Sequence, residues 1–71
     1  MTILVTGSSG FIGSNLVKHL QKKKLSFHGI DKVSNPYFKF KNFNKIKLEN
    51  KNDISKLIIK KKIKKVIHLA A

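Results

Sequence analysis

Residues 6–13 read TGSSGFIG, and their glycines, Gly7, Gly10 and Gly13, recur at every third position. The run just before them, TILVT, is apolar and rich in β-branched side chains, which is typical of a buried parallel strand. After them, apolar side chains at three- and four-residue spacing predict an amphipathic helix from residue 11 to about residue 24. The side chains that define its apolar face are Phe11, Ile12, Leu16, Val17 and Leu20.

Each glycine of this octet has a physical role in a strand–turn–helix unit. Gly7 permits a sharp exit from the strand, Gly10 lets the backbone approach a diphosphate, and Gly13 lets the helix pack closely on the strand. Free N–H groups at the positive end of the helix dipole would then hold the phosphates. A glycine-rich turn without a ligand is the alternative, and the strand before, the helix after and an acid at the end of the next strand argue against it.

Beyond this unit, the pattern predicts two strands separated by a long connection. A second strand is expected over residues 25–31 and a short third strand over residues 45–48. Residues 32–45 contain turn chemistry without a sustained period, so we expect an irregular connection there. Its aromatic side chains are expected to cover the sheet, namely Tyr37, Phe38, Phe40 and Phe43.

The rest of the chain predicts one more helix and a fourth strand. Asn52 or Asp53 is expected to cap the helix, residues 60–65 to close it, and residues 66–71 to form the strand. The side chains expected to point inward from the helix are Ile54, Leu57, Ile58 and Ile59. The order β-α-β-β-α-β predicts an α/β fold, the N-terminal part of a Rossmann-type doubly wound parallel sheet with its first and fourth strands adjacent. A ligand of such a sheet binds at the carboxyl ends of the strands, here residues 7–13 and 68–71.

Composition narrows the classes of partner. The formal net charge of +13 comes from sixteen basic residues, all lysine, against three acidic ones, and would attract nucleic acid or other anionic surfaces. Phosphate and base readout usually recruit arginine, so we expect solvated lysine faces and no sequence-specific nucleic-acid binding. The chain has no cysteine and no apolar run long enough for a membrane span, so we expect a cytoplasmic location and no membrane insertion.

Asp31, at the end of the expected second strand, is the acid that a dinucleotide site requires at this point. Its carboxylate would accept hydrogen bonds from both hydroxyls of an adenosine ribose and would repel a 2′-phosphate, which favours NAD over NADP. The ammonium of Lys32 would partly offset that repulsion. The alternative role for Asp31 is that of a turn-forming residue.

Three separated segments resemble one family. Residues 6–13 match the TGxxGFIG signature of the extended short-chain dehydrogenase/reductase family, which includes NAD-dependent sugar-nucleotide epimerases and dehydratases. Residues 31–35 are similar to the acid-led segment after the second strand, and residues 66–71 resemble the VIHLAA strand of these enzymes. The resemblance implies NAD as cofactor, hydride transfer on a nucleotide-sugar substrate in the full-length protein, and allows a homodimer of that protein.

The same resemblance implies a set of cofactor-binding residues: Gly7, Ser9, Gly10, Phe11, Ile12, Gly13, Asp31, Lys32, Glu49, Asn50, Leu69, Ala70 and Ala71. One position departs from the family, which usually has an aspartate and an apolar residue after the third strand, where the carboxylate binds the adenine amino group. Glu49 and Asn50 stand there, and Asp53 with Ile54 is the alternative equivalent. Glu49 as a surface acid and Asp53 as a helix cap remain open as well.

Catalytic residues are not expected within these residues. The family uses a Tyr-x-x-x-Lys pair with a nearby serine or threonine. Tyr37 and Lys41 have that spacing but precede the third strand, too early in the chain to be this pair. The histidines have no spacing that would assemble a metal site, and near His68 the family uses backbone rather than the imidazole.

We therefore expect residues 1–71 to be an incomplete NAD(P)-binding segment, without the catalytic and substrate-binding parts, that is inactive alone. A truncated gene or fragment, a small nucleotide-binding module and a part of a longer chain remain open. The alternative function is a non-catalytic module that senses a dinucleotide or binds anions or nucleic acid.

Overall fold

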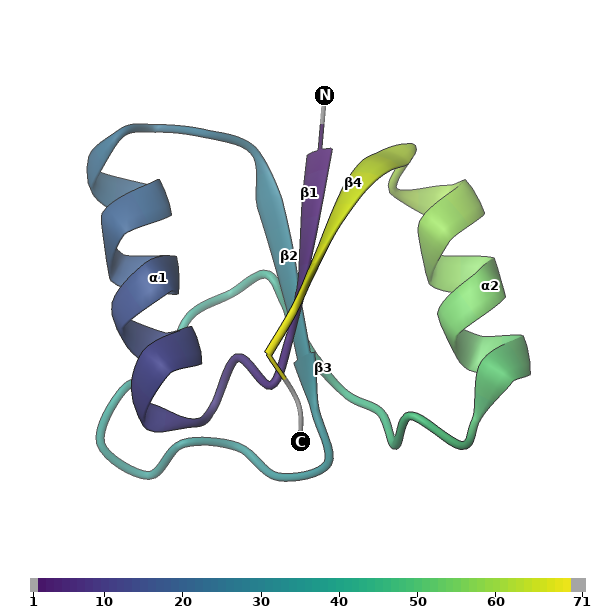
Figure 1. Cartoon of the computed structure of the whole chain (residues 1–71), viewed down its shortest axis with the longest axis horizontal. Coiled ribbons are helices and arrows are strands. Elements are labelled where there is room, and N and C mark those ends of the chain that lie inside the picture. Colours follow the sequence, from purple (N-terminus) through teal and green to yellow (C-terminus); the bar gives the residue numbers. More distant parts are fainter. Residues whose placement is uncertain (1, 70–71) are drawn as a thin grey trace.

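A computed structural model describes residues 2–69 and forms one four-stranded parallel sheet (Figure 1). Its strand order is β3-β2-β1-β4, so the predicted α/β class and the adjacency of the first and fourth strands are both confirmed. The elements, in chain order, are β1 (Thr2–Thr6), α1 (Phe11–Lys22), β2 (Phe27–Asp31), β3 (Phe43–Lys45), α2 (Lys51–Lys60) and β4 (Ile63–His68).

The central strand β1 divides the core into two halves. Successive side chains of a strand point to opposite faces, so Leu4 and Val5, both fully buried, enter different clusters. Leu4 packs with Leu57 of α2, whereas Val5 packs with Val17 of α1. The two helices accordingly cover opposite faces of the sheet (Figure 1). This arrangement leaves the carboxyl ends of the strands uncovered by either helix.

The connection between β2 and β3 supplies aromatic cover for the α1 side of the sheet. The Phe40 ring lies 5.7 Å from that of Phe27, and the Phe38 ring stacks on Phe40 at 5.6 Å. Lys18 of α1 places its ammonium 5.0 Å from the centre of the Phe38 ring, a cation–π contact. The prediction of aromatic cover is thus confirmed for these rings and wrong for Tyr37, whose side chain is 96% exposed.

The third strand lies earlier than the expected residues 45–48. Gly29 to Asp31 of β2 pair in parallel with Phe43 to Lys45, and Ile46 continues the ladder through its N–H to the Asp31 carbonyl (2.9 Å). Ile46 and Leu48 then pack against the Leu4 cluster on the α2 side. Pairing with the end of β2, which the spacing of apolar residues does not reveal, decides the register.

The helix α2 begins at a different cap from the expected Asn52 or Asp53. Asn50 is the N-cap residue: its Oδ1 accepts the Asp53 backbone N–H (3.3 Å), and its Nδ2 donates to Asp53 Oδ2 (2.7 Å). Asp53 thus stands in the first turn, where the helix dipole favours a negative charge. The helix therefore begins two or three residues earlier than the sequence indicated.

The C-terminal end of α2 also departs from expectation. Lys62 has a left-handed backbone (φ 54°) and donates its N–H to the Ile59 carbonyl (3.3 Å), which ends the helix before residues 61–65 can extend it. The fourth strand then begins at Ile63, so Lys64 and Lys65 belong to β4 and not to the helix. Ile59, expected to point inward, is 78% exposed.

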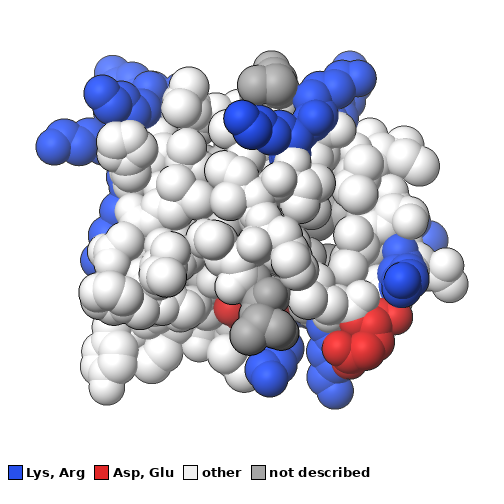
Figure 2. All heavy atoms as spheres, in the orientation of Figure 1, with Lys and Arg blue, Asp and Glu red and all other residues white. Residues whose placement is uncertain are grey.

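All sixteen lysines are exposed, which confirms the expectation of solvated lysine faces. In the view of Figure 2, lysine side chains gather at the periphery and uncharged residues cover the centre of the face on which β4 lies nearest the viewer. Within residues 2–69, no helix is long and apolar enough to cross a membrane.

A buried histidine joins β2 to β3. The His28 side chain is 5% exposed, and its Nε2 lies 2.5 Å from Asn44 Oδ1. Burial lowers the pKa of His28 below its ordinary value of 6.5, the Asn44 hydrogen bond raises it, and the charge of Lys61 lowers it further, with a net decrease. The neutral imidazole is therefore the favoured form in the folded chain.

This lowered pKa makes stability depend on pH. Because the unfolded chain binds a proton at His28 more readily than the folded chain does, the free energy of unfolding should be highest above pH 6.5 and fall as pH drops below it. We expect the urea midpoint to be lower at pH 5.5 than at pH 7.5, and His28→Gln to reduce that difference. His19→Gln, a change of an exposed histidine, should leave it intact; equal differences in both variants would contradict the assignment.

Candidate functional site

The glycine loop between β1 and α1 is a tight turn. Gly7 has a left-handed backbone (φ 70°), which costs a residue with a Cβ about 1 kcal/mol. Its carbonyl accepts the Gly10 N–H at 3.2 Å, which closes the turn. The role predicted for Gly7, the sharp exit from the strand, therefore agrees with the observed backbone.

Gly13 and Gly10 lack a side chain for different reasons. A Cβ on Gly13 would lie 2.0 Å from the Gly7 carbonyl oxygen, so the packing of α1 on the turn excludes any side chain there. A Cβ on Gly10 would lie 3.5 Å from that oxygen, an ordinary contact, and the backbone at Gly10 is extended (φ −75°, ψ 175°), which any residue adopts. The fold requires a glycine at position 13, whereas at position 10 it does not.

The first turn of α1 presents unpaired N–H groups beside Gly10. Gly10 is the N-cap residue, and α1 has neither a side-chain cap nor an acidic residue in its first turn. The first helical hydrogen bond of α1 is donated by the Ser14 N–H to the Gly10 carbonyl (2.8 Å). The N–H groups of residues 11–13 precede it and have no partner within the helix. Such groups, together with the helix dipole, form an anion-binding end.

Phe11 and Ile12 lie at this end and not in the core. Their side chains are 84% and 67% exposed, although their spacing had placed them on the apolar face of the helix. The buried face of α1 begins at Gly13 and continues through Val17 and Leu20. Because the close contact of Gly13 with the turn sets which side of α1 faces the sheet, the two preceding side chains are left outside.

Asp31 at the end of β2 faces the glycine loop. Its Oδ2 accepts the backbone N–H of Ser9 (3.0 Å) and its Oδ1 that of Lys32 (2.7 Å). The hydroxyl of Ser9 in turn donates to the Val33 carbonyl (2.6 Å), and Asn35 Nδ2 donates to the Ser9 carbonyl (3.0 Å). The loop after β1 and the loop after β2 are thus tied together, with the carboxylate between them.

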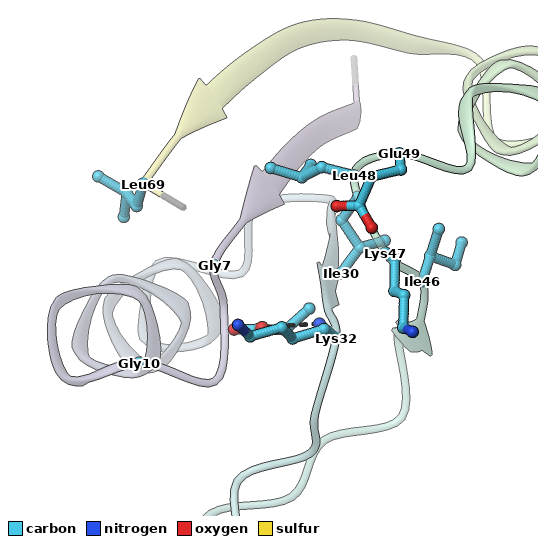
Figure 3. A pocket seen from close by; sticks show the side chains of 10 residues that line it. Gly7, Gly10, Ile30, Lys32, Ile46, Lys47, Leu48, Glu49 and Leu69 are labelled. Atoms are coloured by element: carbon cyan, nitrogen blue, oxygen red, sulfur yellow. Dashed lines mark hydrogen bonds between the residues drawn. The ribbon is translucent and has the colours of Figure 1, made fainter. Parts of the chain in front are cut away.

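A pocket of about 290 Å³ opens at the carboxyl ends of the strands (Figure 3). It lies between the glycine loop and the segment after β3, and Lys32 extends from the end of β2 toward the loop in this view. The residues lining it are Gly7, Gly10, Ile30, Asp31, Lys32, Ile46, Lys47, Leu48, Glu49 and Leu69. Among the candidate residues, the structure therefore brings Gly7, Gly10, Asp31, Lys32, Glu49 and Leu69 together.

Of the two candidates for the acid after the third strand, Glu49 lines this pocket and Asp53 does not. Asn50 does not line it either, because its side chain caps α2 and bonds Asp53. Ser9 is held by the loop after β2, and Gly13 is packed beneath the turn.

Hydrogen bonds hold the end of β4 against the end of β1 beside the pocket. The Leu69 N–H donates to the carbonyl of Thr6 (3.2 Å) and lies 3.1 Å from its hydroxyl oxygen. That hydroxyl also lies 2.7 Å from His68 Nδ1, so the imidazole positions Thr6, a contact that the sequence did not indicate. Ala70 and Ala71, the other two candidates from this segment, lie outside the residues that the structure describes.

Sequence reasoning also missed the support beneath the loop. Ser8 is fully buried, and both its N–H (3.2 Å) and its hydroxyl (3.3 Å) bond the Ile30 carbonyl. A Cβ on Gly29 of β2 would lie 2.7 Å from Ser8 Oγ and from the Phe40 ring, so this glycine makes room for both. A glycine inside a β-strand pattern signals such a close approach and could have pointed to this contact.

Comparison with known proteins identifies the family of the chain. Residues 3–71 match the NAD-dependent epimerase/dehydratase family. The chain belongs to that family. The resemblance to this family, recognised from the TGSSGFIG, Asp31 and VIHLAA segments, is confirmed by the same match.

Individual similar proteins are consistent with this family assignment. Protein CapI of Staphylococcus aureus is 38% identical, with all of this chain covering 25% of that protein. The UDP-glucose 4-epimerase of Thermotoga maritima, solved with UDP-glucose, is 31% identical with a TM-score of 0.88, and that of Thermus thermophilus, solved with NAD, is 29% identical with a TM-score of 0.89. All of this chain covers 24% of each, so it spans about a quarter of the length of these relatives.

Proposed function

We propose that this chain is an incomplete NAD(P)-binding segment that holds the adenosine and diphosphate of NAD. The observation that carries the proposal is the contrast between the two helix-proximal glycines. Packing explains the glycine at position 13, whereas at position 10 a Cβ would make only an ordinary contact, so the fold does not require a glycine there. Gly10 lies where a diphosphate would meet the free N–H groups of α1. The pocket volume, at the lower end for ligand sites, suits one part of a dinucleotide.

Each lining group has a chemical role in this proposal. The N–H groups of Phe11 and Ile12 donate to the phosphates, and the Asp31 carboxylate accepts from the ribose hydroxyls while keeping its backbone partners. Glu49 accepts from the adenine amino group. Apolar side chains of the pocket, Ile30, Ile46 and Leu48, cover the faces of the base.

For the whole protein, we propose a sugar-nucleotide epimerase or dehydratase, in which NAD, when bound, supplies the hydride acceptor. The family match and the UDP-glucose and NAD complexes of the two similar epimerases support this reaction class and a nucleotide-sugar substrate. A cytoplasmic location remains a prediction from the sequence. The non-catalytic sensor would use the same pocket, and no feature of the described residues favours it.

The preference between the two cofactors tests the role of Asp31. We expect the dissociation constant for NADH to be about tenfold or more below that for NADPH, because the 2′-phosphate removes the hydrogen bond from the 2′-hydroxyl to the carboxylate and brings a second anion against it. Asp31→Asn keeps the shape of the side chain and removes its charge, and should bring the two constants toward equality. Fluorescence titration with both cofactors measures them.

Asp53→Asn is the matched control, since it removes the same charge from a side chain outside the pocket. It should leave the ratio unchanged. Equal affinities in the unmodified chain, or a preference for NADPH that Asp31→Asn leaves untouched, would remove Asp31 from cofactor selection.

A further inference from the structure

A second hollow lies at the opposite edge of the sheet from β4. It is an open groove of about 600 Å³ between the β3 edge and α2, and it shares only Ile46 with the pocket described above. Because β3 ends the strand order, the groove lies at an edge of the sheet, and Figure 1 shows α2 on the side away from α1. A ligand in it would leave the carboxyl ends of the strands free.

The charge of this groove is strongly positive. Five lysines and one aspartate line it, a net of four positive charges: Lys41, Lys45, Lys56, Lys60, Lys61 and Asp53. The aspartate is already engaged, because its Oδ2 accepts a hydrogen bond from Asn50 and its backbone bonds the same residue. Low-dielectric walls that carry one sign of charge concentrate counter-ions between them.

Neutral donors complete the lining. His28 and Asn44 both line the groove, and the neutral imidazole donates its Nε2–H to Asn44 Oδ1. This orientation leaves the Nδ2 hydrogens of the exposed Asn44 available as donors. Cationic and neutral donors together suit an anion with many oxygen acceptors.

We propose that the groove binds a linear oligophosphate, with Lys45, Lys56 and Lys60 contacting its phosphates. The aromatic content of the groove argues against nucleic-acid bases as the recognised group. Phe43 is the one phenylalanine among the residues that line the groove. Its ring meets the Phe40 ring edge to face (5.5 Å, 74°) and is therefore not free to stack on a base. The recognised chemistry is therefore the phosphate chain.

The test titrates the full chain with inorganic tripolyphosphate by calorimetry at physiological salt. The triple variant Lys45→Gln, Lys56→Gln, Lys60→Gln removes three exposed groove charges and should weaken binding about tenfold. The control variant Lys22→Gln, Lys23→Gln, Lys24→Gln has the same net charge but changes the end of α1, on the other face of the sheet. It should stay within about twofold of the unmodified chain, because distant charges are screened.

Two further readouts separate the groove from general charge attraction. The ring signals of His28 in NMR spectra should shift on tripolyphosphate addition, while those of exposed His19 stay in place. Equal weakening in both triple variants, or unmoved His28 signals, would overturn the proposal. So would an oligothymidylate that binds more tightly than tripolyphosphate, since the groove would then recognise a nucleic-acid strand. Circular dichroism verifies that both variants are folded.

Discussion

Replacing Gly13 with alanine is expected to remove most of the free energy of unfolding of the chain. The new Cβ would lie 2.0 Å from the Gly7 carbonyl oxygen and 2.9 Å from Ser8 Cα, both backbone atoms that cannot move aside without opening the turn. Overpacking of this kind costs about 3 kcal/mol. A domain of this size has a stability of only about 3–5 kcal/mol, so a large part of it is lost.

The expected decrease in stability distinguishes a close contact at Gly13 from the ordinary effect of alanine in a helix. In the interior of an exposed helix, glycine to alanine stabilises by about 1 kcal/mol, which is the opposite direction. Urea unfolding followed by circular dichroism measures the change, with Gly10→Ala as the matched control, whose Cβ would make only an ordinary contact with the Gly7 carbonyl oxygen. A Gly13→Ala variant as stable as the control would show that the helix is not seated on the turn as described.

Replacing Gly10 with valine should leave the fold intact and remove dinucleotide binding. The backbone at Gly10 is extended, so valine costs only the weaker helix capping, about 1 kcal/mol. Its side chain would fill the space proposed for the diphosphate. Two hydrogen bonds to a charged phosphate contribute about 3 kcal/mol, so the affinity for NADH should fall about a hundredfold.

Titration with NADH measures that loss, and a thermal unfolding curve verifies the fold of the variant. Gly10→Ala should bind with intermediate affinity, because its single methyl group intrudes less. A Gly10→Val variant that is folded and binds NADH as the unmodified chain does would remove the glycine loop from the binding site.

The local pattern around the glycine loop was sufficient to predict the fold class. The run of residues 2–6, the glycine spacing and the acid at Asp31 each indicate one element or one role, and the adjacency of the first and fourth strands follows from the doubly wound order of such a sheet. Asp31 and Gly10 line one pocket, because they lie at the carboxyl ends of adjacent strands, whereas their role in binding a cofactor stays a prediction.

Features that depend on distant contacts were not predictable in the same way. The position of β3 follows from its pairing with Gly29 to Asp31, and the cap at Asn50 follows from where α2 starts after that strand. The outward position of Phe11 and Ile12 follows from the seating of Gly13 on the turn. In each case the residues of the segment fit two arrangements, and a partner elsewhere in the chain selects one.

The most direct test of the central claim is an amide NMR titration of the unmodified chain with ADP-ribose, the part of NAD that the pocket is proposed to hold. We expect the amide signals of residues 10–12 to move most, together with those of Asp31, Lys32 and Glu49, and we expect the Gly10→Val variant to show none of these shifts. Signals that stay in place throughout the glycine loop, or shifts confined to the residues of the groove between β3 and α2, would contradict the proposed binding of NAD at the start of α1.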